Sequence, residues 1–342
     1  MQMNIVPHVL KIENVFYSDN TFWLSTEPTD DMNTFLDNCK IGEQKIDHAT
    51  KTIDNLFVMN TIHSCFAHAV MDATFPYFWA MNDIREYERK HIEFQLFVRQ
   101  KEVLLFSQQN LPIIDSDNKR YKHAWNTLVE TLSSQPVVFE HLLGTEEDIF
   151  FIKTCYVYVK DDNHQRSAWN CITHYPDVHV QPKDVLFSDE TIQTQLKRFA
   201  KVVTSCCTSA SSSLSPAKTN IIVINRKTSY RNINDQTDTI CEIIQRKCAS
   251  LLMHKKYRFQ GIVFLEDLTL AEQISIFQTN DVIIAPHGAN LIHSIWFPDK
   301  TIIEIFFEER NNIMYKRICD LVGSDIIQIH HSNICTFLED QF

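Results

Sequence analysis

The chain has 342 residues and a mass of 40.1 kDa, a length that suits two domains of ordinary size sharing a cleft. Hydrophobic residues make up 44% of it and charged residues 22%, so each domain can bury a core. The formal net charge of −11 excludes the basic surface that binds nucleic acid or anionic lipid, and an anionic ligand must therefore be met by a few local basic groups.

The glycines and cysteines exclude several common enzyme classes. The five glycines stand far apart, at Gly42, Gly144, Gly261, Gly288 and Gly323. The G-x-G-x-x-G dinucleotide loop, the Walker A loop and the G-x-S-x-G nucleophile elbow each need two glycines within a few residues, so none is present. The ten cysteines contain no C-x-x-C, which argues against a zinc ribbon or a thioredoxin-type redox pair.

The N-terminal residues lack a basic segment followed by an apolar one, so no secretory signal is predicted. The longest uncharged run, Val282–Pro298, contains Pro286, His287, Gly288 and Asn290 and is a poor membrane span. We therefore expect a cytoplasmic protein without a membrane span. Few glycines beside abundant Ile, Asn, Asp and Lys are typical of an AT-rich genome, and a viral protein made in host cytoplasm fits this expectation.

The first half predicts a mixed α/β domain. Short β-like runs near the N-terminus are followed by a helix over 63–87, which Pro76 should kink or divide because proline lacks a backbone N–H. Three strands and a further helix follow, over Ile92–Val98, Val137–Phe139, Ile149–Val159 and Tyr121–Thr131.

The second half predicts a Rossmann-like domain. A helix near Ile192–Val203 leads into a serine-rich segment over 204–213, which is typical of a linker. Apolar strands then alternate with amphipathic helices, which indicates a parallel sheet buried on both faces. The predicted strands are Ile221–Ile224, Gly261–Leu265, Val282–Ala285, Ile302–Phe306 and Ile326–Ile329, and the predicted helices are Asp235–Met253 and Leu270–Gln278. We expect domains at 1–203 and 220–342 joined by a linker over 204–219, and the last helix can pack back on the first domain.

Ligands of parallel sheets bind beyond the carboxyl ends of the strands, and basic residues follow one such strand. Asn225, Arg226 and Arg231 come directly after Ile221–Ile224. Two guanidinium groups there could hold a diphosphate by charge-assisted hydrogen bonds. The alternative is that both arginines are ordinary solvated side chains.

A second strand ends in small residues. His287, Gly288, Ala289 and Asn290 follow the strand Val282–Ala285 and open a helix, whose exposed N–H groups would face a phosphate. The alternative is a tight turn with a core histidine. Glu304 lies in an otherwise apolar strand, where it must be paired if it is buried, either with a sugar hydroxyl or with an arginine.

One pair of residues could carry out acid–base catalysis, and two other groups of residues could bind a metal ion instead. His68 and Asp72 stand four residues apart on one helix face, as base and orienting partner or as an ordinary helix contact. A D-x-D at Asp115 and Asp117 could bind a divalent cation, although the lysine and arginine that follow favour a solvated turn. The remaining metal candidates, whose spacing matches no common pattern, are His63, Cys65, His68, His330 and His331.

Three segments in this order resemble glycosyltransferase family 61. They are His68 to Pro76, Arg226 to Arg231 with Asn234 and Asp235, and Leu265 through the H-G-A of His287–Ala289 to Phe297, Pro298 and Glu304. The chain departs from the family pattern in three places: Phe297 and Pro298 are adjacent, the arginines are more widely spaced, and Asn290 replaces the usual Gly or Gln.

The resemblance implies a GT-B fold of two Rossmann-like domains facing a cleft. It implies an inverting transfer, without an obligatory metal or other cofactor, from a UDP-sugar to a hydroxyl of a glycan or glycoprotein. UDP-GlcNAc and UDP-xylose are the expected donors. The second domain would hold the donor, and Asp72 or His68 in the first would be the base. The alternatives are a non-catalytic nucleotide- or glycan-binding protein and a metal-dependent transferase using Asp115 and Asp117.

Overall fold

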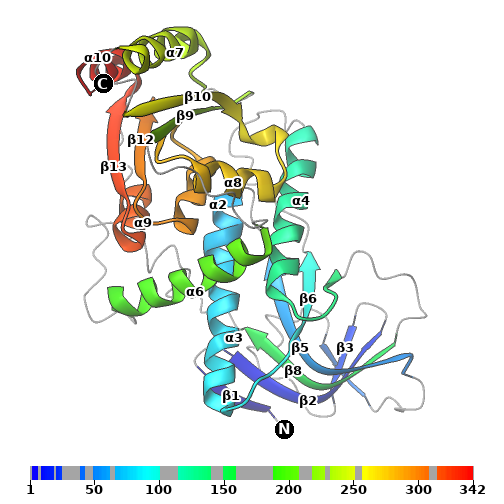
Figure 1. Cartoon of the computed structure of the whole chain (residues 1–342). Helices are drawn as coiled ribbons and strands as arrows, with labels where there is room; N and C mark the ends of the chain where they lie inside the picture. The colour runs from blue at the N-terminus through cyan, green and yellow to red at the C-terminus, as the bar shows by residue number, and fades with distance from the viewer. Residues whose placement is uncertain are drawn as a thin grey trace. The chain divides into compact units, whose positions relative to one another are not determined.

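The computed structural model describes the chain in thirteen segments: residues 2–6, 9–18, 21–24, 39–42, 49–61, 66–100, 115–139, 149–158, 188–207, 218–227, 232–250, 256–307 and 314–341. The chain forms two compact units (Figure 1). The first comprises residues 1–64, 68–111 and 128–170, and the second comprises residues 65–67, 112–127 and 171–342. Helix α4 (Asp115–Leu132) therefore begins in the second unit and ends in the first.

The first unit is built on a mixed sheet, which has eight strands in the described part of the chain. Its order is β4-β3-β2-β8-β5-β6-β7, with β1 paired to β2. Strand β5 is parallel to β6 and β8, whereas β2 is antiparallel to β1, β3 and β8. The strands are β1 Gln2–Val6, β2 Val9–Ser18, β3 Thr21–Leu24, β4 Cys39–Ile41, β5 Lys51–Thr61, β6 Gln95–Gln100, β7 Val138–Phe139 and β8 Phe150–Tyr158. The α/β prediction is confirmed, and this sheet is less regular than a Rossmann-like domain implies.

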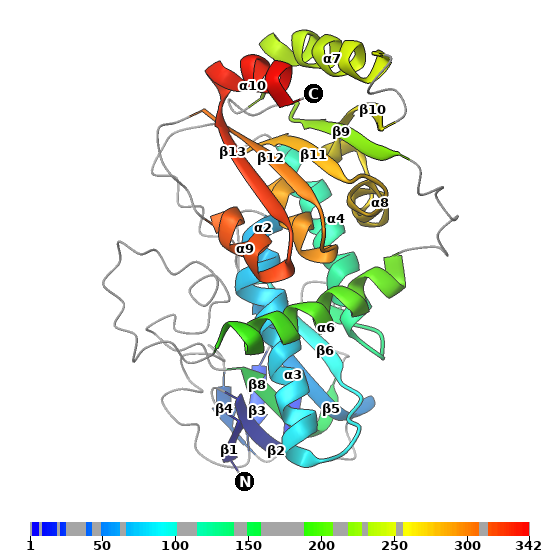
Figure 2. The same cartoon turned by 60° about the vertical axis from the view of Figure 1, so that its left-hand side comes forward.

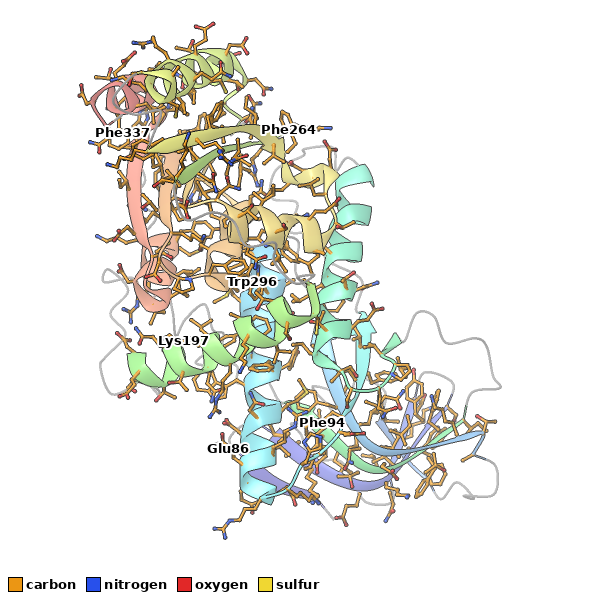
Figure 3. All side chains as sticks on the ribbon, viewed as in Figure 1. Glu86, Phe94, Lys197, Phe264, Trp296 and Phe337 are labelled. Carbon is orange, nitrogen blue, oxygen red and sulfur yellow. The ribbon has the colours of Figure 1, made fainter. Side chains whose placement is uncertain are left out.

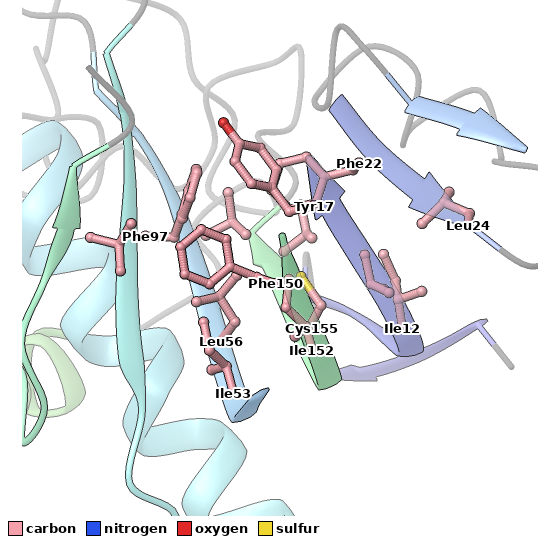
Figure 4. Close-up of a cluster of buried hydrophobic side chains, with 14 of the residues drawn as sticks. Ile12, Tyr17, Phe22, Leu24, Ile53, Leu56, Phe97, Phe150, Ile152 and Cys155 are labelled. Carbon is pink, nitrogen blue, oxygen red and sulfur yellow. The ribbon is translucent and has the colours of Figure 1, made fainter. Parts of the chain in front are cut away.

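Apolar side chains cover both faces of this sheet. On one face, the rings of Tyr17, Phe22 and Phe97 pack in tilted and T-shaped pairs with centroids 4.8–5.7 Å apart inside a larger buried cluster (Figure 4). Helix α3 (Phe75–Glu88) packs against the sheet through Tyr77, whose ring centroid lies 6.0 Å from that of Phe57 on β5. These aromatic contacts fix α3 on the sheet because buried aromatic side chains contribute large areas of apolar contact.

The helix before α3 is interrupted. A single α-helical turn, α2 (Phe66–His68), passes into a π-helical segment over Ala69–Thr74 and then into α3. Pro76 has no N–H to donate to the carbonyl four residues earlier, which weakens the α-helical hydrogen-bond ladder at this point. The Thr74 hydroxyl donates to the Ala69 carbonyl at 2.8 Å. The predicted helix is thus interrupted by a π-helical segment next to Pro76, where a kink or division was expected, and π-helical segments are frequent at functional sites.

The second unit contains a sheet in which every pairing is parallel, in the order β10-β9-β11-β12-β13. Counted from β9, this is the order 2-1-3-4-5 of flavodoxin-like doubly wound sheets. The strands are β9 Thr219–Asn225, β10 Tyr257–Phe264, β11 Val282–Pro286, β12 Thr301–Phe306 and β13 Asp325–His330. All five predicted strands of this half are confirmed, because strands buried on both faces are read in sequence as continuous apolar runs.

Helices cover both faces of the parallel sheet (Figures 1 and 2). Helices α7 (Asn234–Ala249) and α10 (Ile334–Gln341) pack on one face, where isoleucines of both helices and of strands β9, β11 and β12 form a buried cluster. The other face carries α8 (Leu270–Thr279), the 3-10 helix η6 (Ala289–Trp296) and α9 (Met314–Val322). Figure 3 labels Phe337 of α10 and Trp296 of η6, which lie on opposite sides of this sheet.

The last helix packs within the second unit. Helix α10 contacts α7: Ile334 and Leu338 join the isoleucine cluster, and Glu339 accepts a hydrogen bond from Arg246 and pairs with Lys247. The last helix therefore completes one face of the parallel sheet.

Helix α6 (Asp189–Cys207) belongs to the second unit. The domain boundary predicted near residue 203 falls within this helix. Phe199 of α6 lies 5.4 Å from the Trp296 ring of η6, and this aromatic contact ties the helix to the parallel sheet's helical layer. Residues 204–207 of the predicted linker form the last turn of α6, and residues 208–217 lie outside the described residues. Among the helices that the structure describes, none is both long and apolar enough to cross a membrane.

Candidate functional site

The ends of the neighbouring strands β9 and β11 lie at the point where the strand order of the parallel sheet reverses. From β9 the chain moves outward to β10, whereas from β11 it moves to β12 on the opposite side. Ligands of doubly wound sheets bind in the crevice at such a point, beyond the carboxyl ends of the strands. The residues that end β9 and β11 are Asn225 with Arg226, and Pro286 with His287 and Gly288. Two of the predicted binding segments therefore meet at this edge of one sheet.

Gly288 and Arg226 lie directly against each other. A Cβ built on Gly288 would lie 2.7 Å from Nη2 and 2.8 Å from Cζ and Nη1 of the Arg226 guanidinium. The Gly288 backbone has φ 153° and ψ −172°, a region that only glycine adopts readily. Two features therefore require glycine at position 288: the backbone conformation, and the space beside Cα that the Arg226 guanidinium fills.

A buried asparagine anchors the backbone that carries Arg226. The Asn225 side chain, which is fully buried, donates to Asn234 Oδ1 at 2.9 Å and to the Thr237 hydroxyl at 3.1 Å. Its Oδ1 accepts from the backbone N–H groups of Arg226 and Ile233, at 2.8 and 3.0 Å. One side chain therefore holds both ends of the β9–α7 connection. Asn234 lies on α7, where its Oδ1 accepts from Asn225, and its predicted binding of the donor stays a prediction.

His287 and Glu304 form a buried couple next to this edge. Nδ1 of His287 lies 2.6 Å from Oε1 of Glu304, and Oε2 of Glu304 accepts from Nε2 of Gln328 at 2.9 Å. The Glu304 side chain is fully buried, whereas 12% of the His287 side chain is exposed. Glu304 was predicted to meet a sugar hydroxyl or an arginine, but its partners in the structure are a histidine and a glutamine. The charge of Glu304 can therefore act on a ligand through the His287 ring, although Glu304 itself is not exposed.

Aromatic rings fix the orientation of His287. Phe306 of β12 stacks on the imidazole with centroids 5.0 Å apart, and Tyr315 of α9 meets it edge-on at 5.6 Å. An ionised Glu304 accepts a hydrogen bond from Nδ1–H of His287, and Nε2 is then the acceptor nitrogen of the ring. No pattern in the sequence pointed to Phe306 or Tyr315, because their contact with His287 depends on strand and helix placement.

The helix that follows Gly288 is a 3-10 helix. The Leu291 N–H donates to the Gly288 carbonyl at 3.0 Å, which is the i to i+3 bond of that helix. Ala289 and Asn290 occupy its first positions, where backbone N–H groups have no partner within the helix. The Asn290 side-chain nitrogen is buried and has no hydrogen-bond partner among the described residues. These donors provide polar groups for an anionic or hydroxyl-bearing ligand.

Several predicted residues lie beyond what the structure describes. Arg231, His63 and Cys65 lie outside the described residues, as do the side chains of His68, Asp72, Asp115 and Asp117. The backbone places His68 at the end of α2 and Asp72 in the π-helical segment, so both stand in the first unit on the helix that Pro76 divides. Their catalytic assignment stays a prediction.

The adjacent histidines near the C-terminus have partners of an ordinary kind. His330 Nδ1 lies 2.9 Å from the Ser332 hydroxyl, and the His331 ring stacks on Phe307 with centroids 5.2 Å apart. In the described segments no group of three or more His, Cys, Asp or Glu side chains is arranged to hold a metal ion.

Comparison with known families decides what kind of protein carries this site. The family model Glycosyltransferase 61 matches residues 66–303, which is more than half of the chain. The chain belongs to the glycosyltransferase 61 family. Membership of this family indicates a glycosyltransferase, and the resemblance found in the sequence motifs is confirmed. A search of curated proteins gives no match.

The family match contains most of the site described above. Arg226, His287 and Gly288 lie inside the matched residues, and Glu304 lies one residue beyond them. Gln328 lies 25 positions past the end of the match at 303. The glycosyltransferase 61 region thus contributes the switch-point residues, and β13 adds a contact from the C-terminal part of the chain.

Proposed function

We propose that this protein is an inverting glycosyltransferase that uses a UDP-sugar as donor and a hydroxyl of a glycan or glycoprotein as acceptor. The observation that carries the proposal is the packing of Arg226 against Gly288 at the switch point of a parallel sheet. This arrangement provides a cation and closely approachable backbone where such sheets bind nucleotides. Family membership supports the transfer reaction.

The chemistry requires charge stabilisation at the leaving group. The acceptor oxygen attacks the anomeric carbon from the face opposite the diphosphate, the bond from that carbon to the UDP oxygen breaks, and the bond's electron pair leaves with UDP. Arg226 meets the developing negative charge in our proposal, with Arg231 as a further cation from the same connection. The hydroxyl proton passes to Asp72, or to His68 if that residue is the base.

We expect the reaction to proceed without an obligatory metal, because these protein groups supply positive charge and N–H donors at the diphosphate. The nearby Lys227 adds little, since it is paired with Asp267 at 2.6 Å and 47% of its side chain is exposed. The GT-B arrangement of the two units, with UDP-GlcNAc or UDP-xylose as donor, is part of the same proposal.

The test is nucleotide binding to the full chain, followed by donor turnover. Ligands that bind only the native state raise the unfolding temperature, so UDP, GDP, CMP and their sugar conjugates are compared in EDTA and in manganese. We expect one UDP-sugar to stabilise the protein in EDTA, and Arg226→Ala to abolish most of that stabilisation. Lys227→Ala is the matched control, because it removes a neighbouring cation that Asp267 already balances.

Turnover then separates an enzyme from a binding protein. Release of UDP from the stabilising donor with a panel of glycan acceptors, together with inverted anomeric configuration in the product, supports the proposal. UDP binding without turnover on any acceptor would favour a non-catalytic nucleotide-binding role. Activity that requires manganese and is lost in EDTA would contradict the metal-independent mechanism.

A further inference from the structure

Gln328 is the only polar residue between Ile326 and Ile329 of β13, and the sheet register puts it beside the site. Glu304 on β12 pairs with Ala285 on one side and with Gln328 on the other. Side chains directly opposite each other across parallel strands point to the same face. Ala285, Glu304 and Gln328 therefore form one row across the sheet, and His287 lies two residues beyond Ala285 on the same face.

This row explains how Glu304 can be charged inside the protein. A carboxylate that is fully removed from water must have its oxygens hydrogen-bonded. One oxygen meets His287 at 2.6 Å and the other meets Gln328 at 2.9 Å. Gln328 is thus the partner of the carboxylate oxygen that His287 does not use.

The chemical type of this partner matters. A carboxylate only accepts hydrogen bonds, so the NH₂ side of the Gln328 amide faces it. A glutamine fixes the carboxylate without carrying charge, whereas a lysine or arginine in its place would neutralise Glu304. The full negative charge therefore remains available to the imidazole. A neutral donor is the type of group that a site needs when it positions a histidine through a buried carboxylate.

We propose that Gln328 is a positioning residue of the donor site. It holds the Glu304 carboxylate so that His287 keeps its proton on Nδ1 and presents Nε2, as a hydrogen-bond acceptor, to a hydroxyl of the donor. This inference rests on the proposed function for the identity of the ligand, and on the two hydrogen bonds of Glu304 for the geometry. Gln328 does not contact the donor, and it acts through Glu304 and His287.

Two substitutions remove the amide donor in different ways. Gln328→Met keeps the approximate volume and removes the hydrogen bond, and Gln328→Glu keeps the shape while placing a second carboxyl beside Glu304. Ile326→Val is the control, because Ile326 lies on the same strand and the same face one pair earlier and has no polar side chain. Gln328→Met tests the role even if the second carboxyl prevents folding.

The first readout is the protonated nitrogen of His287, measured by ¹⁵N NMR of the full-length protein and assigned with His287→Gln. We expect the Nδ1–H tautomer in the wild type and in Ile326→Val, and a mixture of tautomers in Gln328→Met. A wild-type Nε2–H tautomer, or the unchanged Nδ1–H tautomer in every folded Gln328 variant, would overturn the proposal.

The second readout is steady-state kinetics with the donor that stabilises the wild type. We expect kcat/KM to fall about tenfold in Gln328→Met, because a hydrogen bond to a charged group is lost, and to stay within twofold in Ile326→Val. Wild-type rates in Gln328→Met contradict the positioning role. The two failures are distinguishable: absence of nucleotide binding by the wild type defeats the proposed function, whereas the NMR result still decides the role of Gln328.

Discussion

Replacing Gly288 with alanine tests the switch-point site most directly, because the structure separates its effect on stability from its effect on binding. The backbone at this position lies in a region that costs other residues about 1–3 kcal/mol. The new methyl group would also lie 2.7–2.8 Å from three guanidinium atoms of Arg226. Carbon atoms in favourable contact are about 3.5–4.0 Å apart, so the guanidinium must retreat by about 0.7 Å or more.

The two effects have different consequences. The guanidinium is the end of a flexible side chain, so it can move away at little cost to folding. The stability loss of Gly288→Ala should therefore come from the backbone and amount to about 1–3 kcal/mol. The displaced Arg226 loses a charge-assisted hydrogen bond to the ligand, which is worth about 1.5–3 kcal/mol. The dissociation constant for UDP should accordingly rise about 10- to 150-fold.

The assay is calorimetric titration of UDP in EDTA, with urea unfolding of the same samples. Gly323→Ala is the matched control, because Gly323 has φ 82° and no atom within 4 Å of a built Cβ. It should lose stability in the same way while its UDP affinity stays within twofold of the wild type. In an Arg226→Ala background, Gly288→Ala should weaken UDP binding no further, since interacting sites are non-additive. Wild-type affinity in Gly288→Ala, or a full additional loss in the double variant, would refute the reasoning.

Three further substitutions probe other parts of the molecule. Asp72→Asn should lower kcat at least 100-fold, in the range for loss of a general base, while UDP affinity in calorimetry stays within twofold; normal turnover would remove Asp72 from the mechanism. Asn225→Ala should lower the urea-unfolding free energy by about 1–3 kcal/mol through the buried donors and acceptors it leaves unpaired, and it should weaken UDP binding through Arg226; unchanged stability would contradict the anchoring role. His293→Gln should reduce the loss of stability in acid. Burial lowers the pKa of His293 from 6.5 to about 3 in the folded protein, whereas in the unfolded chain this side chain takes up a proton below about pH 6.5. The unfolding free energy of the wild type therefore falls as the pH falls from 6.5 towards 3. Between pH 7.5 and pH 5 the wild type should lose about 2 kcal/mol more than His293→Gln, in which the glutamine oxygen can still accept the hydrogen bond that the Trp296 indole N–H donates to His293 Nδ1 at 2.9 Å; equal losses in urea titrations at the two pH values would contradict this.

The parallel sheet was predictable because its physics is local in the sequence. Strands buried on both faces need apolar, β-branched residues at nearly every position. Ile221–Ile224 meets that need without interruption, and Ile302–Phe306 meets it at every position except Glu304. The corresponding strands, Thr219–Asn225 and Thr301–Phe306, differ from the prediction by two residues or fewer at each end. The glycine at the end of the third strand was predictable as well, since close backbone approach is a role that other residues fill poorly.

The first unit was harder to predict because strand direction is a property of pairing. The run Val15–Tyr17 indicates a strand, and the structure contains it as part of β2. Nothing within that run specifies that β2 lies antiparallel to β8, which is more than 130 positions away in the sequence. The same limit applies to α6, whose amphipathic pattern predicts a helix but does not indicate which core its Phe199 joins.

In the site as well, the sequence indicated individual residues but not the contacts between them. Arg226, His287, Gly288 and Glu304 were each predicted from their position after or within a strand. The strand order was needed to bring Arg226 onto Gly288, and the register was needed to place Gln328 beside Glu304. A polar residue in an apolar strand drew attention to Glu304, and the same signal was present at Gln328. The catalytic assignment of Asp72 and the role of Arg231 stay predictions.

The overall charge of the protein makes the short-range contacts decisive. With a net charge of −11, the mean electrostatic field repels an anionic donor, so long-range attraction cannot supply the affinity. One nearby cation, Lys227, is balanced by Asp267, and the couple of His287 with Glu304 brings a negative charge of its own. Binding of a diphosphate in our proposal must therefore come from groups in direct contact with it. This places the main requirement on Arg226 and on the backbone N–H groups that Gly288 leaves open to a close approach.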